Sequence, residues 1–166
     1  MMTDLNEIIT HAARSGNLAV LAEVITQEAD INIKDEKGYA PLIIACYNGK
    51  YEAARLLLQG GADINMTDAG GGTALMGAAF KGYPDIANLL LDYGADPNLQ
   101  HGNGSTALIF ATMFGKNELI EILLDKGADK HLQERGGLTA ADFATQQGNE
   151  AGLELIKNHQ GVNQQE

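Results

Sequence analysis

The chain has 166 residues and a formal net charge of -11. That charge argues against nucleic acid or an anionic membrane as the main partner, because both require basic surfaces. A single cysteine excludes an internal disulfide, and no apolar run approaches the roughly 20 residues of a membrane helix. The N-terminal residues lack the basic stretch and apolar run of a secretory signal. We therefore expect a cytoplasmic protein, with export that needs no cleavable signal left open.

A segment of 33 residues, 68–100, recurs on both sides at that spacing. The tripeptide Gly-Ala-Asp at 61–63 returns at 94–96 and 127–129. A fixed period of this kind is the signature of a repeat array, which grows by stacking similar units. We expect one domain over residues 1–160, with a polar tail at 161–166. Its units should cover about 5–34, 35–67, 68–100, 101–133 and 134–159.

The first unit carries apolar residues at helical spacing in two short segments, 5–13 and 18–25. Glu28 stands where later units have the glycine that ends the second helix. Glycine enters the left-handed conformation of such an end without a Cβ clash, whereas glutamate does not. A more polar, degenerate first unit is what a terminal cap requires, because its outer face meets water.

The second unit opens with a turn at 35–38, which starts on a side-chain acceptor and ends on glycine. Ala40-Pro41 begins a helix, since proline is tolerated in the first helical turn. Each unit then has two helices of about ten residues or fewer, which are marginal alone in water and must be held by neighbours. In the last unit Lys157 replaces the leucine of the inner units. This substitution indicates a second cap.

The start of each first helix also repeats. Ala-Pro-Leu-Ile-Ile-Ala at 40–45 corresponds to segments at 73–78, 106–111 and 139–144, and Gly-Ala-Asp-x-Asn is intact at 61–65 and 94–98. With these motifs the sequence resembles an ankyrin repeat protein, whose 33-residue unit is a turn and two antiparallel helices marked by Thr-Pro-Leu-His-x-Ala. No unit keeps the histidine of that motif, and one keeps the proline. The resemblance implies an all-α solenoid of stacked helix-turn-helix units joined by β-turn or hairpin-like loops.

The sequence predicts neither catalysis nor a cofactor or metal site. Its four histidines lack the i, i+4 or paired spacing of metal ligands. Residues 102–107 match Gly-x-Gly-x-x-Ala, but they follow the turn of a repeat and not the buried strand that a nucleotide-binding fingerprint needs. Acidic pairs such as Asp35 and Glu36 are typical of a solvated face. We therefore expect a protein that is not an enzyme and holds no cofactor.

The resemblance implies that partners bind on the concave side, which is formed by the turn tips and the exposed end of each first helix. Just before the helix-ending glycines, the three middle units place four large apolar residues on one line. Aromatic residues are enriched in binding hot spots, and contiguous exposed apolar area marks an interaction site. The candidate partner-binding residues are Tyr39, Tyr47, Phe80, Lys81, Met113, Phe114, Lys37 and Arg135. Packing of the aromatics between adjacent helices is the alternative, and the two roles are not exclusive.

We expect a monomeric, non-catalytic adaptor, scaffold or inhibitor that binds another protein with a basic-rimmed surface. The alternative is a structural or self-associating spacer array, in which the acidic exterior only provides solubility. A small-molecule-binding protein or enzyme is less favoured, because such an array lacks a closed pocket lined by convergent polar groups.

Overall fold

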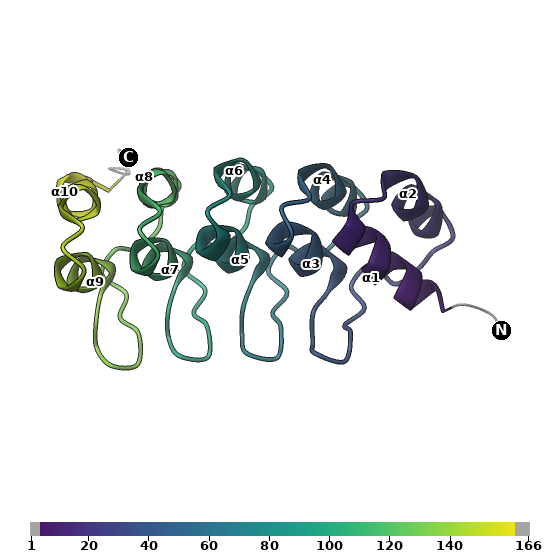
Figure 1. Cartoon of the computed structure of the whole chain (residues 1–166), viewed down its shortest axis with the longest axis horizontal. Coiled ribbons are helices and arrows are strands. Elements are labelled where there is room, and N and C mark those ends of the chain that lie inside the picture. The colour runs from purple at the N-terminus through teal and green to yellow at the C-terminus, as the bar shows by residue number, and fades with distance from the viewer. Residues whose placement is uncertain (1–3, 162–166) are drawn as a thin grey trace, which may run out of the picture.

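The computed structural model describes residues 4–161. Within that range ten helices form five antiparallel pairs that stand side by side in a row (Figure 1). The pairs are α1 Leu5–Ser15 with α2 Leu18–Thr26, α3 Pro41–Tyr47 with α4 Tyr51–Gln59, α5 Ala74–Lys81 with α6 Pro84–Asp92, α7 Ala107–Met113 with α8 Asn117–Asp125, and α9 Ala140–Gln146 with α10 Glu150–Asn158. No strand occurs in this part of the chain, so the expected all-α solenoid is confirmed. Of the expected polar tail, all but Gly161 lies outside the described residues.

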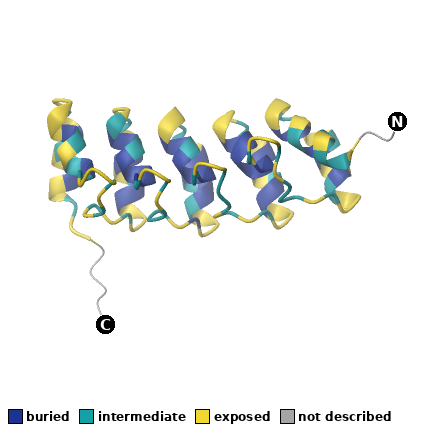
Figure 2. Ribbon diagram, turned by 90° about the horizontal axis from the view of Figure 1, so that it is seen from below, coloured by how far each residue is buried: buried dark blue, intermediate teal, exposed yellow. Residues whose placement is uncertain are grey.

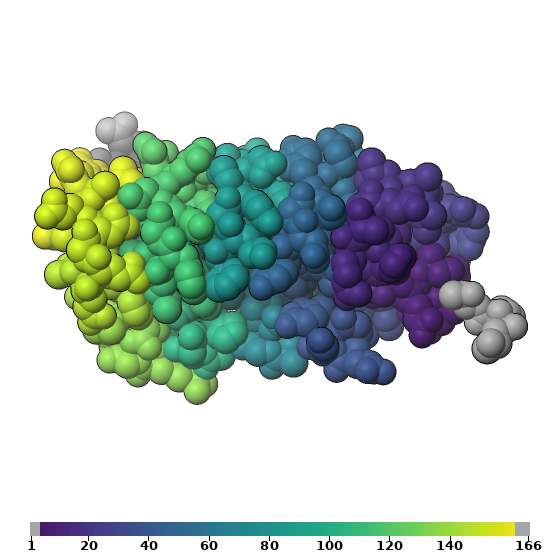
Figure 3. Space-filling model, viewed as in Figure 1, coloured from purple at the N-terminus to yellow at the C-terminus, as the bar shows by residue number. Residues whose placement is uncertain are grey.

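The helices form two layers. The first helices of the pairs make one row and the second helices the other, while the long connecting loops project on the side of the first helices (Figure 1). Each helix packs against its own partner and against the equivalent helix of the next pair. In the space-filling view the pairs follow one another as successive bands of colour (Figure 3). The elongated stack therefore exposes every inner unit on both broad faces.

Threonine side chains start three of the five first helices. Thr73, Thr106 and Thr139 each accept a hydrogen bond from the backbone amide three residues on, which satisfies one of the free donors at a helix start. Ala40 occupies the equivalent position before α3 and offers no side-chain cap. There Pro41 supplies a preset backbone angle and lacks the amide that would need a partner.

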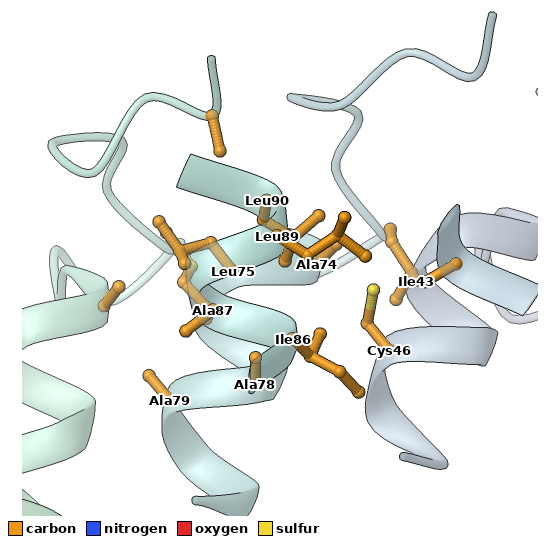
Figure 4. Packing of buried hydrophobic residues seen from close by; sticks show 14 of the residues in the cluster. Ile43, Cys46, Ala74, Leu75, Ala78, Ala79, Ile86, Ala87, Leu89 and Leu90 are labelled. Carbon is orange, nitrogen blue, oxygen red and sulfur yellow. The ribbon is translucent and has the colours of Figure 1, made fainter. Parts of the chain in front are cut away.

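The core consists of columns of apolar side chains that repeat with the units. One column is fully or almost fully buried in every unit and contains Val24, Leu57, Leu90, Leu123 and Ile156. Buried residues lie along the sides of the helices, whereas the loops are largely exposed or half-buried (Figure 2). Between the second and third units, Ile43 and Cys46 of α3 lie toward Ala74 and Ile86 (Figure 4). Burial raises the pKa of the Cys46 thiol, which belongs to this packing.

The two ends of the stack differ from its middle. Lys157 is exposed, whereas Leu124, one period earlier, is buried. Glu28 adopts a φ of 59°, and it is the one non-glycine residue with positive φ among residues 4–161. The equivalent glycine of the next unit, Gly61, has a φ of 91°. Glu28 therefore ends α2 in the conformation that glycine provides elsewhere, at a steric cost.

Side chains also join the units across the loops. Asn32, Asn65 and Asn98 each accept a hydrogen bond from the backbone amide of an aspartate 31 residues further on, at 2.7 to 3.0 Å. The loop tips add direct backbone hydrogen bonds between units. In one of them the amide of Gly102 donates to the carbonyl oxygen of Gly70 at 2.8 Å. Inter-unit polar contacts thus include those of the Gly-Ala-Asp-x-Asn ending and the loops, and the helices add others, such as the bond from the Asn149 side chain to the Asn117 side chain at 2.8 Å.

Candidate partner-binding surface

Three aromatic rings lie in a row at the C-terminal ends of the first helices of the middle units. Tyr47 ends α3, Phe80 lies in the last turn of α5, and Phe114 directly follows α7. The rings of Tyr47 and Phe80 are stacked with centroids 6.1 Å apart and planes at 13°. The ring of Phe114 meets that of Phe80 edge-on, with centroids 4.5 Å apart. We call Tyr47, Phe80 and Phe114 the aromatic row.

The aromatic row is both packed and open to solvent. Tyr47 and Phe114 are each 44% exposed and Phe80 is 36% exposed, although their rings contact one another. The ammonium group of Lys81 lies 4.8 Å from the centroid of the Tyr47 ring, in reach of a cation–π interaction. Met113 is half-buried against the core, and its carbonyl oxygen accepts a hydrogen bond from the Gln147 side chain at 2.7 Å.

A groove of about 460 Å³ runs beside the aromatic row. Its lining combines the rings of Tyr47 and Phe80 with Phe110 of α7, and with Met76 and Gly77 of α5. The rings and the buried side chain of Met76 make this surface apolar. Since α3, α5 and α7 belong to three successive units, the groove exists only in the stacked array.

Polar side chains also line the groove, namely those of Arg14, Asn48, Asp68, Thr73 and His101. Arg14 comes from the end of α1, and its guanidinium lies 3.9 Å from the carboxylate of Asp35. Asp68 belongs to the loop before α5, where its Oδ1 accepts hydrogen bonds from two backbone amides at 2.8 Å each. His101 packs edge-on against Phe110 with ring centroids 5.7 Å apart, while its Nδ1 lies 3.1 Å from the side-chain oxygen of Asn103.

The three candidate residues of the loop tips are placed differently. Tyr39 lines the groove and is 37% exposed, and its amide donates to the Asp35 carboxylate at 2.9 Å. Lys37 is exposed in the same loop, and its amide also bonds to Asp35. Arg135 is exposed in the loop before α9, where its amide donates to the carbonyl oxygen of Asn103 at 2.9 Å. Of the eight candidates, the groove brings together Tyr39, Tyr47 and Phe80. Its lining does not include Lys37, Lys81, Met113, Phe114 or Arg135.

Among the groove residues, the candidates from the sequence were Tyr39, Tyr47 and Phe80, and sequence reasoning missed the others, which include Met76, Gly77, His101 and Phe110. The 33-residue period could have pointed to two of them. Gly77 is one period after Ile44 and one period before Phe110. His101 likewise stands where the flanking units carry Asp68 and Glu134.

Two carboxyl groups of the last unit accept hydrogen bonds within the fold, outside the groove. Backbone amides of Gly136 and Leu138 hold the pKa of the Glu134 carboxyl below its usual range. The backbone amide and hydroxyl of Thr139 do the same for the pKa of Asp142. Within residues 4–161 no three histidine, cysteine or acidic side chains are placed to hold a metal. None of the helices in that range has the length and apolar character to cross a membrane.

Comparisons with known proteins agree with this architecture. The chain matches a family model described as ankyrin repeats (3 copies) over residues 9–101 and again over 75–166, which together cover more than half of it. It is also 38% identical over 60 residues to ankyrin repeat domain-containing protein 29 of Danio rerio. The aligned part is 36% of this chain and 20% of that relative, so the match spans a fifth of the relative's length. The chain belongs to the ankyrin repeat family.

Proposed function

We propose that the chain is a non-catalytic adaptor, scaffold or inhibitor that binds a partner protein along the face carrying the aromatic row. Ankyrin repeats are generally protein–protein interaction modules, and the family is generally non-catalytic. The observation that carries the proposal is the aromatic row itself: three rings from three units touch one another while each stays more than a third exposed. Aromatic side chains arranged in this way are typical of the centre of a binding surface.

The stacked architecture favours binding. The helices that present the row are held on both sides by neighbouring helices. The rings themselves restrain one another through their stacked and edge-on contacts. A surface that is already ordered loses little conformational entropy when a partner arrives. Met113 supports the row from the half-buried position beside Phe114.

The charge of the chain bears on the kind of partner. A net charge of -11 produces a negative field that attracts a basic-rimmed surface and speeds its association. Lys37, Lys81 and Arg135 are exposed cations: Lys81 lies over the Tyr47 ring of the aromatic row, whereas Lys37 and Arg135 lie in loops outside the groove. They would select against partners that carry positive charge at those points. We also propose that the protein is a monomer and acts in the cytoplasm.

The test is an affinity capture from lysate of the source cell. A triple variant with Tyr47→Ala, Phe80→Ala and Phe114→Ala is compared with the wild type, after circular dichroism has shown that both are folded. Tyr93→Ala is the matched control, because Tyr93 is also an exposed aromatic residue, at the end of α6 in the row of second helices. The proposal predicts a protein captured by the wild type and the control and lost from the triple variant.

Equal capture by all three proteins would contradict binding through the aromatic row. Sedimentation velocity at several concentrations tests the monomeric state. Concentration-dependent association that disappears in the triple variant would favour a self-associating array instead. A monomer at all concentrations, with a partner lost only from the triple variant, supports the adaptor function.

A further inference from the structure

Gly77 leaves a hollow in the groove where the neighbouring units carry large side chains. It lies inside α5, and the equivalent positions one period before and after are Ile44 and Phe110. Glycine is among the least favourable residues in the interior of a helix, because it loses the most backbone freedom on folding. Its presence here therefore needs a reason other than helix formation.

The surroundings of Gly77 do not require a glycine. It is absent from the residues with positive φ, so its backbone suits any amino acid. A Cβ placed on it would lie 3.6 Å from Cδ2 and 3.9 Å from Cβ of Tyr47, which is ordinary van der Waals contact. By contrast, Gly38 has a φ of 82° and a Cβ there would lie 2.8 Å from the backbone nitrogen of Ala69. The missing side chain of Gly77 therefore serves to leave space.

That space has apolar walls from three units. Tyr47 and Phe80, with nearly parallel rings 6.1 Å apart, line the groove from α3 and α5. Phe110 lines it from α7 and is held by its edge-on contact with His101. Met76, which is buried, contributes to the same lining. The volume of about 460 Å³ lies within the range of pockets that hold small molecules, so it has room for one large side chain.

Charge indicates the chemistry of the occupant. Asp68 brings a carboxylate to the groove, and the net charge of -11 favours cations around it. Arg14 lines the groove, and the Asp35 carboxylate 3.9 Å away offsets its charge. The ammonium group of Lys81 lies 4.8 Å from the centroid of the Tyr47 ring. An apolar hollow in an acidic protein suits an apolar side chain flanked by basic residues.

We propose that the hollow at Gly77 is an anchor site for one large apolar side chain, phenylalanine or a residue of similar size, from a partner segment rich in lysine or arginine. This inference rests on the proposed function and specifies which part of the surface and which partner residue carry it. The anchor enters between Tyr47, Phe80 and Phe110, and a basic neighbour of the anchor lies near the Asp68 carboxylate.

The probes are three synthetic dodecapeptides. Two share a lysine- and serine-rich backbone and differ only in a central phenylalanine or alanine, while the third has glutamate in place of lysine and keeps the phenylalanine. Each is titrated into ¹⁵N-labelled protein at low salt. The basic phenylalanine peptide should shift the amide signals of Gly77 and Tyr47 saturably, and bind about tenfold or more tightly than the alanine peptide. The acidic peptide should bind more weakly than its basic counterpart.

Variants at Gly77 test whether the hollow causes the preference for the phenylalanine peptide. Gly77→Ile places in α5 the kind of residue found at Ile44, and should abolish the preference for phenylalanine over alanine. Gly77→Ala should reduce that preference without loss of stability, because alanine suits the helix interior better than glycine. Ala22→Ile, an exposed position on α2, is the matched control and should bind like the wild type.

Two results would overturn the anchor site: equal affinity of the two basic peptides for the wild type, or an undiminished phenylalanine preference in both Gly77 variants. The proposed function has a separate readout. If the protein partner is captured equally by the wild type and Gly77→Ile but lost when the aromatic row is removed, the interaction surface stands and the anchor site falls.

Discussion

The side-chain oxygen of Asn65 accepts a hydrogen bond from the backbone amide of Asp96 at 3.0 Å, across the boundary between two units. Asn65 is itself held in place, because its own amide donates to the carboxylate of Asp63 at 3.1 Å. The same two bonds occur around Asn32 and Asn98. In the Gly-Ala-Asp-x-Asn ending, the aspartate shapes the turn and the asparagine bonds to the next unit.

Replacement of Asn65 by alanine should therefore weaken one boundary. The amide of Asp96 is exposed and can bond to water instead, so we expect a loss of about 1 kcal/mol in the free energy of unfolding. Hydrogen exchange at the Asp96 amide should become faster. Gln59→Ala, an exposed polar residue of the same unit, is the control and should stay within about 0.5 kcal/mol of the wild type. Unchanged exchange at Asp96 would mean that the bond does not protect this amide in solution.

Ala40→Thr should stabilise the protein by about 1 kcal/mol, because a hydroxyl at this position would accept a hydrogen bond from the amide of Ile43, as Thr73 accepts one from the amide of Met76 in the next unit. Ala40 is 2% exposed and Thr73 is 4% exposed, so a threonine of this kind fits at an equally buried position. Urea unfolding measures the gain. Ala40→Val is the control, since valine has the shape of threonine without the hydroxyl. Equal stability of the two variants would rule out capping as the cause.

The fold was predictable because residues that stand 33 apart in the sequence occupy equivalent places in the packing. Leu57 and Leu90 stand 33 residues apart and are both fully buried, so the sequence pattern and the packing pattern coincide. The exact ends of the helices were not predictable in the same way. For example, α3 has 7 residues and α5 has 8, although their sequences align. Such differences depend on cap geometry and on packing against the next unit.

The candidate surface was predictable only in part. The period places Tyr47, Phe80 and Met113 at equivalent positions, but the ring that meets Phe80 belongs to Phe114, one residue later. A sequence does not specify which of two adjacent side chains turns toward a neighbour, because that depends on how the helix ends. The hollow at Gly77 was missed for another reason: a missing side chain becomes informative only once its surroundings are known.

Glu28→Gly should stabilise the first unit. The glutamate adopts a φ of 59°, where non-glycine residues carry a penalty of about 1–2 kcal/mol. The added freedom of glycine in the unfolded chain offsets about 0.4–1 kcal/mol of the gain. We expect a net gain of up to about 1 kcal/mol by urea unfolding. Gln27→Gly is the control and should destabilise, because Gln27 has a φ of -85° and no strain to relieve. A loss of stability in Glu28→Gly would show that the glutamate is not strained.

The last unit should carry a pH-dependent part of the stability. Asp142 accepts hydrogen bonds from the amide and hydroxyl of Thr139 at 2.9 Å each, and these hold the pKa of its carboxyl below the usual value. The unfolded chain therefore takes up the proton first as the pH falls. The stabilisation is complete above the usual carboxyl pKa of about 3.9 and disappears as the pH drops through the lower value of the folded protein.

Urea unfolding between neutral and acidic pH tests this contribution, together with an NMR titration of the Asp142 carboxyl. Asp142→Asn should lose the part of the acid-induced destabilisation that Asp142 causes, since asparagine does not titrate. Thr139→Ala removes the hydroxyl donor but keeps the backbone donor, so the pKa of Asp142 should rise toward its usual value while remaining below it. An Asp142 pKa that is the same in the wild type and in Thr139→Ala would show that the hydroxyl bond does not stabilise the charged carboxylate. In that case the bond from the Thr139 amide alone would lower the pKa of Asp142, and the acid titration would still detect that lowered pKa.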